Sequence, residues 1–290
     1  MTAEINEPAV YRRRGFGWTR SLNRAWDPVD ALGRQFHFVG MALRGVGHAL
    51  RKHRRQTTEI FTDLAWGNGR ALIVGGGVAP VLALMGVVSG AMIGIIGFEV
   101  LDMLGVGPLA GAVSALANPR ELAPLIAAVG FAAQAGCRIT AEVGAMRISE
   151  EIDALEAQAI DPVPYVVSTR VIASVLTVIP AYLIALALGF ATTKLTVTAV
   201  QGQPTGAYQH YFDMFVQPVD LVYSLIKVAV FVVVVTLVHA YQGFYASGGP
   251  EGVGVASGRA IRASLVAITV CDMVLTLLMW GLESSIDFAG

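Results

Sequence analysis

Charged residues, cysteines and nucleotide-binding motifs are all scarce in this sequence of 290 residues. Only 14% of the residues are Asp, Glu, Lys or Arg, whereas 55% are hydrophobic. This composition excludes an ordinary soluble domain, and a net charge of −1 argues against nucleic-acid binding. The two cysteines, Cys137 and Cys271, have neither disulfide nor metal spacing, so we interpret both as packing residues.

Catalytic motifs are missing as well. No phosphate-binding loop of the form GxxxxGK[ST] occurs, because the glycine run 75–77 lacks the lysine. The five histidines form no metal-ligand pattern, and each is expected at the surface or in a loop. We therefore predict no catalytic residue, no metal site and no cofactor bound by this chain. The amino terminus has no short apolar core with a cleavage site, so no cleaved signal peptide is expected.

Long apolar runs dominate the sequence instead. Five of them approach or exceed the roughly 20 residues that cross a bilayer core, and we predict five transmembrane helices at about 71–98, 120–146, 171–193, 221–240 and 265–282. The fold class is therefore an all-α polytopic membrane protein. The glycine- and proline-interrupted stretch 99–118 is interpreted as an outer connection, and its insertion into the membrane is left open. The stretches 196–220 and 241–262 are expected to be loops.

The amino-terminal third is basic and amphipathic. Residues 1–29 are predicted to be a cytoplasmic lead, and 57–70 a short elbow. Between them, at 30–55, apolar residues recur at alternating steps of four and three, at Leu32, Phe36, Val39, Leu43, Val46 and Leu50. The other face carries Arg34, Arg44, His48, Arg51 and Lys52. We predict an amphipathic helix at the inner membrane surface, with its cations among anionic headgroups. A soluble helix packed on a domain core is the alternative, although the chain offers no such domain.

Loop charges give an orientation. The segments assigned to the inner side contain Arg or Lys, whereas the outer loop and the carboxyl-terminal tail contain only acids. The positive-inside rule then places the amino terminus in the cytoplasm and the carboxyl terminus outside. Arg120 and Lys194, at outer edges, are exceptions.

Four charged residues fall within the spans. Arg138 and Glu142 lie four residues apart, so they could pair near the inner end of the second span, and a structural pair is favoured over a transport role. Lys227 in the fourth span and Asp272 in the fifth lie at depths compatible with a mutual ion pair. In the first span Gly86, Gly90 and Gly94 form a small-residue stripe, which could pack within the chain or at a subunit interface.

The acidic passage 148–160 lies between the second and third spans and must face water. We predict a short amphipathic cytoplasmic helix, with Ile148, Ile152 and Leu155 on one face and acids on the others. Ser149 could cap its start. Such a helix could transmit motion between a membrane domain and a soluble motor.

The passage RISEEIDALEAQAIDP at 147–162 resembles the EQIDAL signature of the MlaE/YrbE permease family, the membrane subunits of Mce-associated lipid ABC transporters. NPRELAPL at 118–125 is similar to the RELxP segment of this family, AEVGAM at 141–146 to its AELGxM, and GGPEGVG at 248–254 to its inner glycine-rich loop. The resemblance covers about 30–290. One departure is that Gln134 stands where many bacterial members have an arginine before the glycine at Gly136, with Arg138 following it, as in the mycobacterial-type branch.

The resemblance implies that a cytoplasmic ABC ATPase dimer, which binds ATP and Mg²⁺, docks on a coupling helix formed by Glu150, Glu151, Ile152, Asp153, Ala154, Leu155 and Glu156. It also implies a plasma-membrane transporter with a second, non-identical YrbE-type permease, Mce-domain proteins outside, and a lipid such as a fatty acid or sterol as substrate. The glycine stripe would then contribute to the dimer interface or lipid cleft, with Glu99 and Asp102 near its outer mouth. The lipid and the direction of transport stay undetermined.

Two other functions are compatible with the residues. In an ATPase-independent transporter or channel, the path would be formed by Arg138, Glu142, Lys227 and Asp272, although no inverted repeat is evident. A membrane scaffold for envelope proteins is the other alternative.

Overall fold

The computed structural model describes residues 17–67 and 77–281, with side chains from residue 33 onward. The described elements are helices throughout, which confirms the all-α prediction. The chain divides into two units, residues 1–40 and 41–290, and each is described by itself. Most of the predicted lead and the beginning of the first predicted span lie outside the described residues.

Two helices precede the first span. Helix α1 (Gly17–Lys52) begins well before residue 30, and after a break at His53 it is followed by α2 (Arg54–Trp66). The predicted elbow at 57–70 is therefore wrong over 57–66. The threonines of this stretch suggest a turn, but Thr57 and Thr62 each donate a hydroxyl hydrogen bond to the carbonyl four residues earlier, which lets a helix accommodate them.

The part of α1 that belongs to the second unit buries small residues and exposes large ones. Ala42, Gly45 and Ala49 are buried, and the Ser168 hydroxyl donates to the carbonyl of Ala42 at 2.6 Å. In contrast, Leu43 and Leu50 from the predicted apolar face are 48% and 47% exposed. Since the apolar face is not packed on the rest of this unit, the structure favours a helix at a lipid interface over a helix on a soluble core.

The first span comprises α3 (Val78–Met92), a π-helical turn (Ile93–Gly97) and α4 (Phe98–Met103). Its glycine stripe packs on the third span. A Cβ atom at Gly86 or Gly90 would overlap with the main-chain carbonyl of Ala185 or Gly189, and one at Gly94 would lie 2.6 Å from Cβ of Thr196. The stripe is thus an intrachain contact, which is one of the two alternatives that the sequence left open.

The second span is a continuous helical segment, Gly107–Ile148. It consists of a 3₁₀ turn (Gly107–Leu109), α5 (Ala110–Ala117), a π turn (Asn118–Leu122), α6 (Ala123–Phe131), a π turn (Ala132–Gly136) and α7 (Cys137–Ile148). The predicted outer connection at 99–118 therefore shrinks to residues 104–106. The glycines misled the prediction because Gly111 permits a close approach to the carbonyl of Tyr208 rather than a chain break.

The remaining spans are also longer than predicted. A π turn (Val163–Ser168), α9 (Thr169–Leu195) and a second π turn (Thr196–Val200) form the third, α11 (Pro218–Phe244) the fourth and α12 (Gly249–Trp280) the fifth. The predicted loop 196–220 contains α10 (Thr205–Phe215), and the predicted loop 241–262 is helical from Gly249. There, only Gly248 and Gly249 adopt positive φ, while the later glycines continue the helix.

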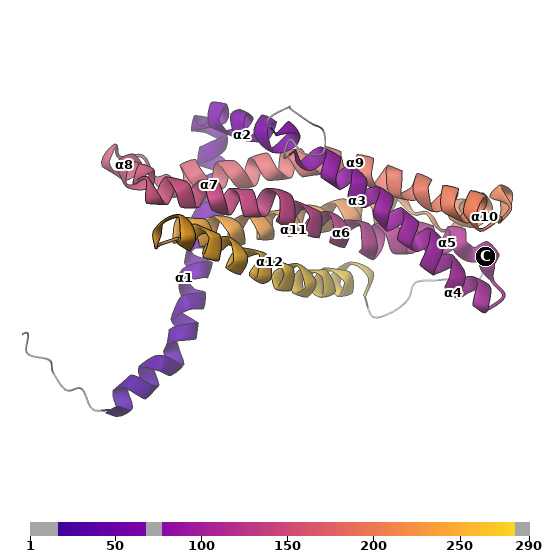
Figure 1. Cartoon of the computed structure of the whole chain (residues 1–290), viewed down its shortest axis with the longest axis horizontal. Helices are drawn as coiled ribbons and strands as arrows, with labels where there is room; N and C mark the ends of the chain where they lie inside the picture. Colours follow the sequence, from indigo (N-terminus) through magenta and orange to yellow (C-terminus); the bar gives the residue numbers. More distant parts are fainter. Residues whose placement is uncertain (1–16, 68–76, 282–290) are drawn as a thin grey trace, which may run out of the picture. The chain divides into compact units, whose positions relative to one another are not determined.

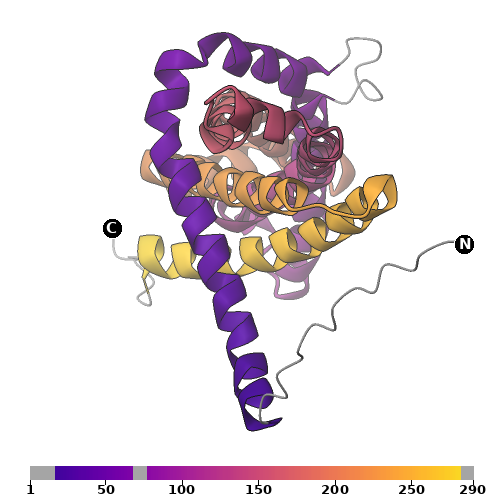
Figure 2. The ribbon, with the colours of Figure 1, turned by 90° about the vertical axis from the view of Figure 1, so that its left-hand side faces the viewer.

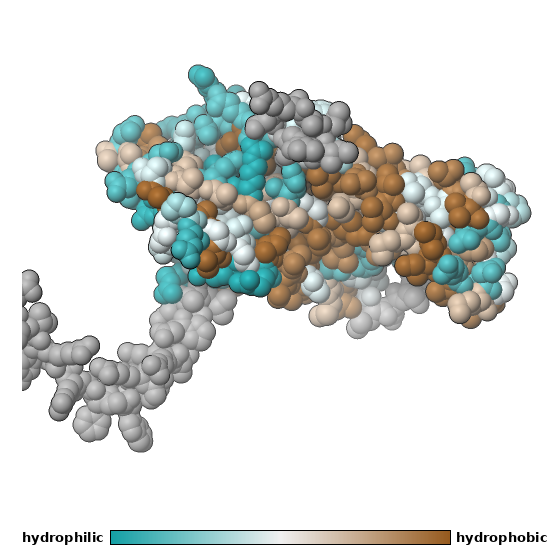
Figure 3. All heavy atoms as spheres, viewed as in Figure 1, coloured by the Kyte–Doolittle hydropathy of each residue, from teal (hydrophilic) through white to brown (hydrophobic). Residues whose placement is uncertain are grey.

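The core of residues 41–281 lies between α3, α6, α9 and α11 (Figure 1), where Leu82, Phe131, Tyr182, Phe231 and Val232 are buried in one apolar cluster. Helix α12 follows one edge of the bundle (Figure 2), and it is the least buried of the five candidate spans. An apolar band covers the middle of the visible face, and polar surface gathers at the end that carries α8 (Figure 3). Five helical segments of the described chain are long and apolar enough to cross a membrane, as predicted.

The glycine contact between α3 and α9 can be tested. We expect Gly90→Ala to destabilise the protein by about 1–3 kcal/mol, because the added methyl group meets backbone rather than a movable side chain. Gly97→Ala is the matched control in the same span, since its Cβ would meet Val113 at an ordinary 3.5 Å. Thermal unfolding of both variants in detergent measures the difference. Equal midpoints would show that the two helices are not in backbone contact.

Candidate functional site

A short helix, α8 (Glu151–Ala157), projects from the polar end of the bundle between the second and third spans. Two residues in the left-handed region, Glu150 (φ 59°) and Ala159 (φ 58°), bracket it. At its end the amides of Ala159 and Ile160 donate to the carbonyls of Glu156 and Leu155, which is the hydrogen-bond pattern of a Schellman motif. The chain thus leaves α7 through one tight turn and returns through another.

The start of α8 differs from the prediction. Glu150, not Ser149, occupies the N-cap position, and no side chain caps the helix. The Ser149 hydroxyl donates instead to the carbonyl of Ala145 and to the carboxylate of Glu151. Ile148 belongs to α7 and is exposed, so only Ile152 and Leu155 remain of the predicted apolar face.

The side chains of α8 divide into an anchor and an exposed surface. Ile152 is fully buried, and Arg147 donates to Asp153 at 2.7 Å, which ties the helix back to α7. Leu155 is half-buried. The other predicted coupling residues are exposed: Glu150, Glu151, Ala154 and Glu156. The helix is therefore held by one apolar side chain and one ion pair, and it presents acids to the surroundings.

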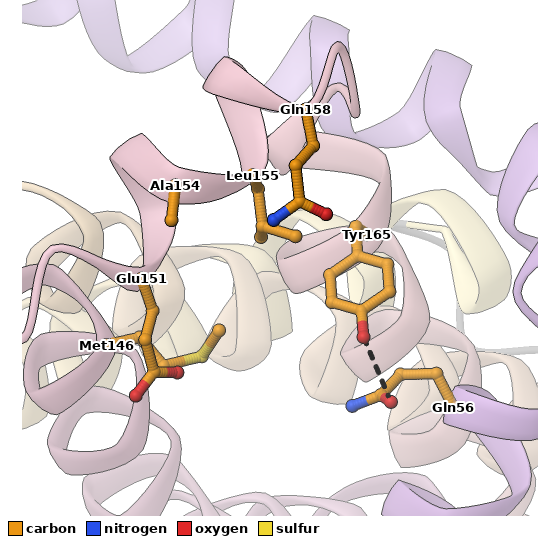
Figure 4. A pocket seen from close by; sticks show the side chains of 7 residues that line it. All are labelled: Gln56, Met146, Glu151, Ala154, Leu155, Gln158 and Tyr165. Carbon is orange, nitrogen blue, oxygen red and sulfur yellow. Dashed lines mark hydrogen bonds between the residues drawn. The ribbon is translucent and has the colours of Figure 1, made fainter.

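Beside α8 lies an open depression of about 410 Å³ (Figure 4). It is lined by Gln56, Met146, Glu151, Ala154, Leu155, Gln158 and Tyr165. The Tyr165 hydroxyl donates to the side-chain carbonyl of Gln56 at 3.3 Å, so residues of α2 and of the third span form one wall together. The depression offers both apolar and acidic groups to a partner side chain.

A network of charged side chains lies near this end of the bundle. The predicted pair is confirmed: Arg138 donates to Glu142 at 2.8 Å. Arg138 also bonds the carboxylate of Asp63 in α2, and Arg170 in α9 donates to Glu142 at 3.3 Å. The network therefore joins α2, α7 and α9. Sequence reasoning missed Asp63 because its helix was taken for an elbow.

The second predicted pair is also confirmed. Lys227 is fully buried, and its ammonium lies 2.6 Å from a carboxylate oxygen of Asp272. It lies 3.1 Å from Glu121 and donates to the carbonyl of Arg120 and the hydroxyl of Thr276, both within 2.8 Å. The prediction missed Glu121 and Thr276. The spacing of Asp272 and Thr276, four residues apart, could have indicated that they share a helix face.

A second polar contact and an apolar depression lie next to the Lys227 cluster. Arg120 and Asp220 form an ion pair at 2.9 Å, and the indole nitrogen of Trp280 donates to Asp220 at 2.7 Å. The depression, of about 440 Å³, is lined by Leu101, Leu109, Ala112, Val113, Leu116, Ala117, Arg120, Glu121, Phe215, Thr276 and Trp280. Glu99 and Asp102 are exposed on α4 and do not line it.

The prediction that every histidine lies at the surface or in a loop is wrong for one of them. His239 is fully buried, not at the surface, and Thr140 bonds its Nδ1 atom at 2.8 Å. Gly136 makes room for the ring, since a Cβ there would lie 2.7 Å from its Nε2 atom. Among the described residues no group of three His, Cys, Asp or Glu could hold a metal ion.

Five apolar spans with paired internal charges and an acidic helix exposed at one polar end define a polytopic membrane subunit of the permease class. The chain belongs to the MlaE permease family, whose model matches residues 70–278. This match confirms the resemblance to the MlaE/YrbE permease family that the passage 147–162 indicated.

Several relatives support this assignment. The chloroplastic protein TRIGALACTOSYLDIACYLGLYCEROL 1 of Arabidopsis thaliana is 34% identical over 173 residues, which are 60% of this chain and 49% of that protein. A probable ABC transporter permease protein of Rickettsia prowazekii is 29% identical over 71% of this chain and 79% of its own length. The intermembrane phospholipid transport system permease protein MlaE of Haemophilus influenzae is 30% identical over 69% of this chain and 77% of its own. The chain thus matches about half of the Arabidopsis protein and nearly four fifths of the bacterial ones.

The buried Lys227 cluster predicts that loss of its cation costs more stability than loss of one of its carboxylates. Lys227→Met leaves Asp272 and Glu121 without their cation and should cost about 3–5 kcal/mol, whereas Asp272→Asn leaves Glu121 to balance Lys227 and should cost less. Thermal midpoints of the two variants in detergent test this order. A larger loss for Asp272→Asn would show that Glu121 does not share the charge.

Proposed function

We propose that this chain is the permease subunit of an ABC-type lipid transporter and that a separate cytoplasmic ATPase, which binds ATP and Mg²⁺, drives it by docking on α8. The exposed acidic surface of α8 carries this proposal, because the helix is anchored by Ile152 and by the Arg147–Asp153 ion pair while Glu150, Glu151 and Glu156 are exposed to a partner. The names of the bacterial relatives support it. The chain itself would move lipid rather than catalyse a reaction.

The proposed orientation places α8 in the cytoplasm and the end of α12 outside. Arg147 lies just before the turn that leads from α7 to α8, whereas Arg259 and Arg262 lie in α12, 10 and 13 residues after its first residue. At the opposite end, Arg120 is neutralised by Asp220, and Lys194 donates to Gln209. Basic residues near the membrane ends favour the cytoplasmic side, which supports this orientation.

For the substrate we propose a fatty acid, sterol or related lipid. The apolar depression near Trp280 supports this class, since it combines apolar walls with Arg120 and Glu121 at one side. Glu99 and Asp102 are exposed at the same end, where they could meet a polar headgroup. We further propose a second YrbE-type permease against the sparsely buried α12, and Mce-domain proteins at this outer end.

The arrangement of charges speaks against an ATPase-independent channel. Glu121 and Arg138 are separated by 17 residues of the second span, which corresponds to about 25 Å of helix. The buried residues between them are apolar, including Ala127, Ala128 and Phe131. The two charged clusters therefore stand apart, as expected for structural pairs.

The docking proposal predicts the effect of changes on α8. Leu155→Asp and Asp153→Lys should each reduce the ATPase activity stimulated by this subunit to the level of the ATPase alone, because Leu155 lines the depression beside α8 and Asp153 contributes an exposed carboxylate to the acidic surface of α8. Glu251→Lys is the matched control, since it reverses an exposed carboxylate at the same end of the bundle. Membrane insertion should be unchanged in all three. Normal stimulation in both α8 variants would contradict docking at this helix.

The partners can be identified by copurification. A tagged full-length chain, extracted in mild detergent, should retain an ABC ATPase, a second permease and bound lipid, which mass spectrometry would detect. Recovery of the chain with no ATPase, together with lipid transport by the chain alone in liposomes, would contradict the proposal.

A further inference from the structure

Four cations surround the break between α1 and α2: Arg51, Lys52, Arg54 and Arg55 lie within five residues, on either side of His53. Within the described residues, only Arg55 of the four has a carboxylate partner, Glu59 at 3.0 Å. That pair is exposed, so it contributes little to stability. Arg54 donates to the carbonyl of Leu50 at the end of α1. The local structure therefore leaves most of this positive charge uncompensated.

The break forms a depression of about 360 Å³, lined by Lys52, His53, Arg55, Gln56, Glu59 and Tyr165. The ring of His53 meets the ring of Tyr165 edge-on, with 5.1 Å between centroids. Burial lowers the pKa of His53, and the nearby His48 and Lys52 lower it further, so this ring is neutral at pH 7. The positive charge of the depression thus comes from Lys52 and Arg55, and Glu59 holds the guanidinium of Arg55 at its rim.

The two helices that carry this charge also carry exposed apolar side chains. Leu43 and Leu50 of α1 are exposed, and so is Trp66 at the end of α2. In the same unit Leu64 of α2 is part of the core cluster of the spans, so α2 lies against the membrane-spanning bundle. A free phosphate would satisfy the cations but not the exposed leucines. A lipid satisfies both, with its headgroup at the break and its acyl chains along the apolar side chains.

We propose that this depression binds the phosphate headgroup of an anionic phospholipid, as a site separate from the transport path. Lys52 and Arg55 supply the charge-assisted hydrogen bonds, and His53 and Gln56 supply neutral donors. Gln56 and Tyr165 also line the depression beside α8. These two hydrogen-bonded side chains therefore form a wall that both depressions share. A bound headgroup would therefore stabilise one side of the coupling region. The binding itself does not depend on α8 being the ATPase contact.

The test uses the full-length chain in nanodiscs of mixed phosphatidylcholine and phosphatidylglycerol, with native mass spectrometry of the lipids retained. Wild type should retain phosphatidylglycerol selectively. The double variant Lys52→Gln/Arg55→Gln should lower that selectivity by at least about tenfold, since it removes the charge-assisted hydrogen bonds to the headgroup, each of which contributes at least about that factor. Thermal unfolding in phosphatidylcholine alone should be unchanged, because both side chains are exposed.

Arg259→Gln/Arg262→Gln is the matched control, since it removes two exposed cations from the same end of the bundle. This control should keep the selectivity, and an equal loss in both double variants would overturn a defined site in favour of general surface charge. Inorganic phosphate and soluble glycerophosphoglycerol should compete only weakly. Full displacement by either would show that the site takes a free anion instead of a lipid. Because binding is measured without ATPase, the result stands whether or not the proposed docking on α8 is correct.

Discussion

Burial of the Lys227 ammonium is the constraint on which the half of the bundle that carries Trp280 depends. An isolated cation within a span is costly, and here the cost is offset by Asp272, by Glu121 and by hydrogen bonds to Thr276 and the carbonyl of Arg120. These groups come from the second, fourth and fifth spans, so a single charge fixes three helices against one another. The π turn Asn118–Leu122 brings both the Arg120 carbonyl and the Glu121 side chain to the lysine. Arg120 is then directed to Asp220 and Trp280, which extends the same polar contact to the end of the bundle.

At the end of the bundle that carries α8, charged side chains also join three helices, but they are less buried. Arg138 bonds Asp63 and Glu142, and Arg170 shares Glu142, so α2, α7 and α9 meet at carboxylates that stay partly exposed. Partly exposed pairs are weaker than buried ones, and they can exchange partners at lower cost. Such a network is compatible with movement beneath α8, whereas the Lys227 cluster is suited to hold its helices in place. The two ends of this unit therefore differ in how deeply the central cation of each network is buried.

The sequence predicted the number and type of the spans and both ion pairs, because long apolar runs and isolated charges within them leave few alternatives. It failed where glycine-rich stretches were interpreted as connections and where 57–70 was interpreted as an elbow. Gly111 and the glycines after residue 249 lie in helices, where the absence of a side chain can permit close packing that only the folded partner reveals. A short helix between the second and third spans was predicted correctly, but its start was not: left-handed Glu150 replaces the expected serine cap, because Ser149 bonds back to α7. Asp63 and Glu121 could not be placed, since their partners lie far away in sequence.

The separation of the two polar ends also limits how they can communicate. Ala127, Ala128 and Phe131 lie between them with apolar contacts, so within residues 77–281 the structure shows no chain of charges that links α8 to the apolar depression near Trp280. A displacement of α8 must then travel through packed helices. The second span is the element suited to this, because it runs as one helical segment from Gly107 to Ile148 and reaches both sites. Its two π turns lie beside Glu121 and just before Arg138. A π turn is a point where a helix can shift its register locally. If α8 and the depression are coupled, we expect the second span to transmit the movement as one helix, with small register shifts at the π turn near each charged cluster.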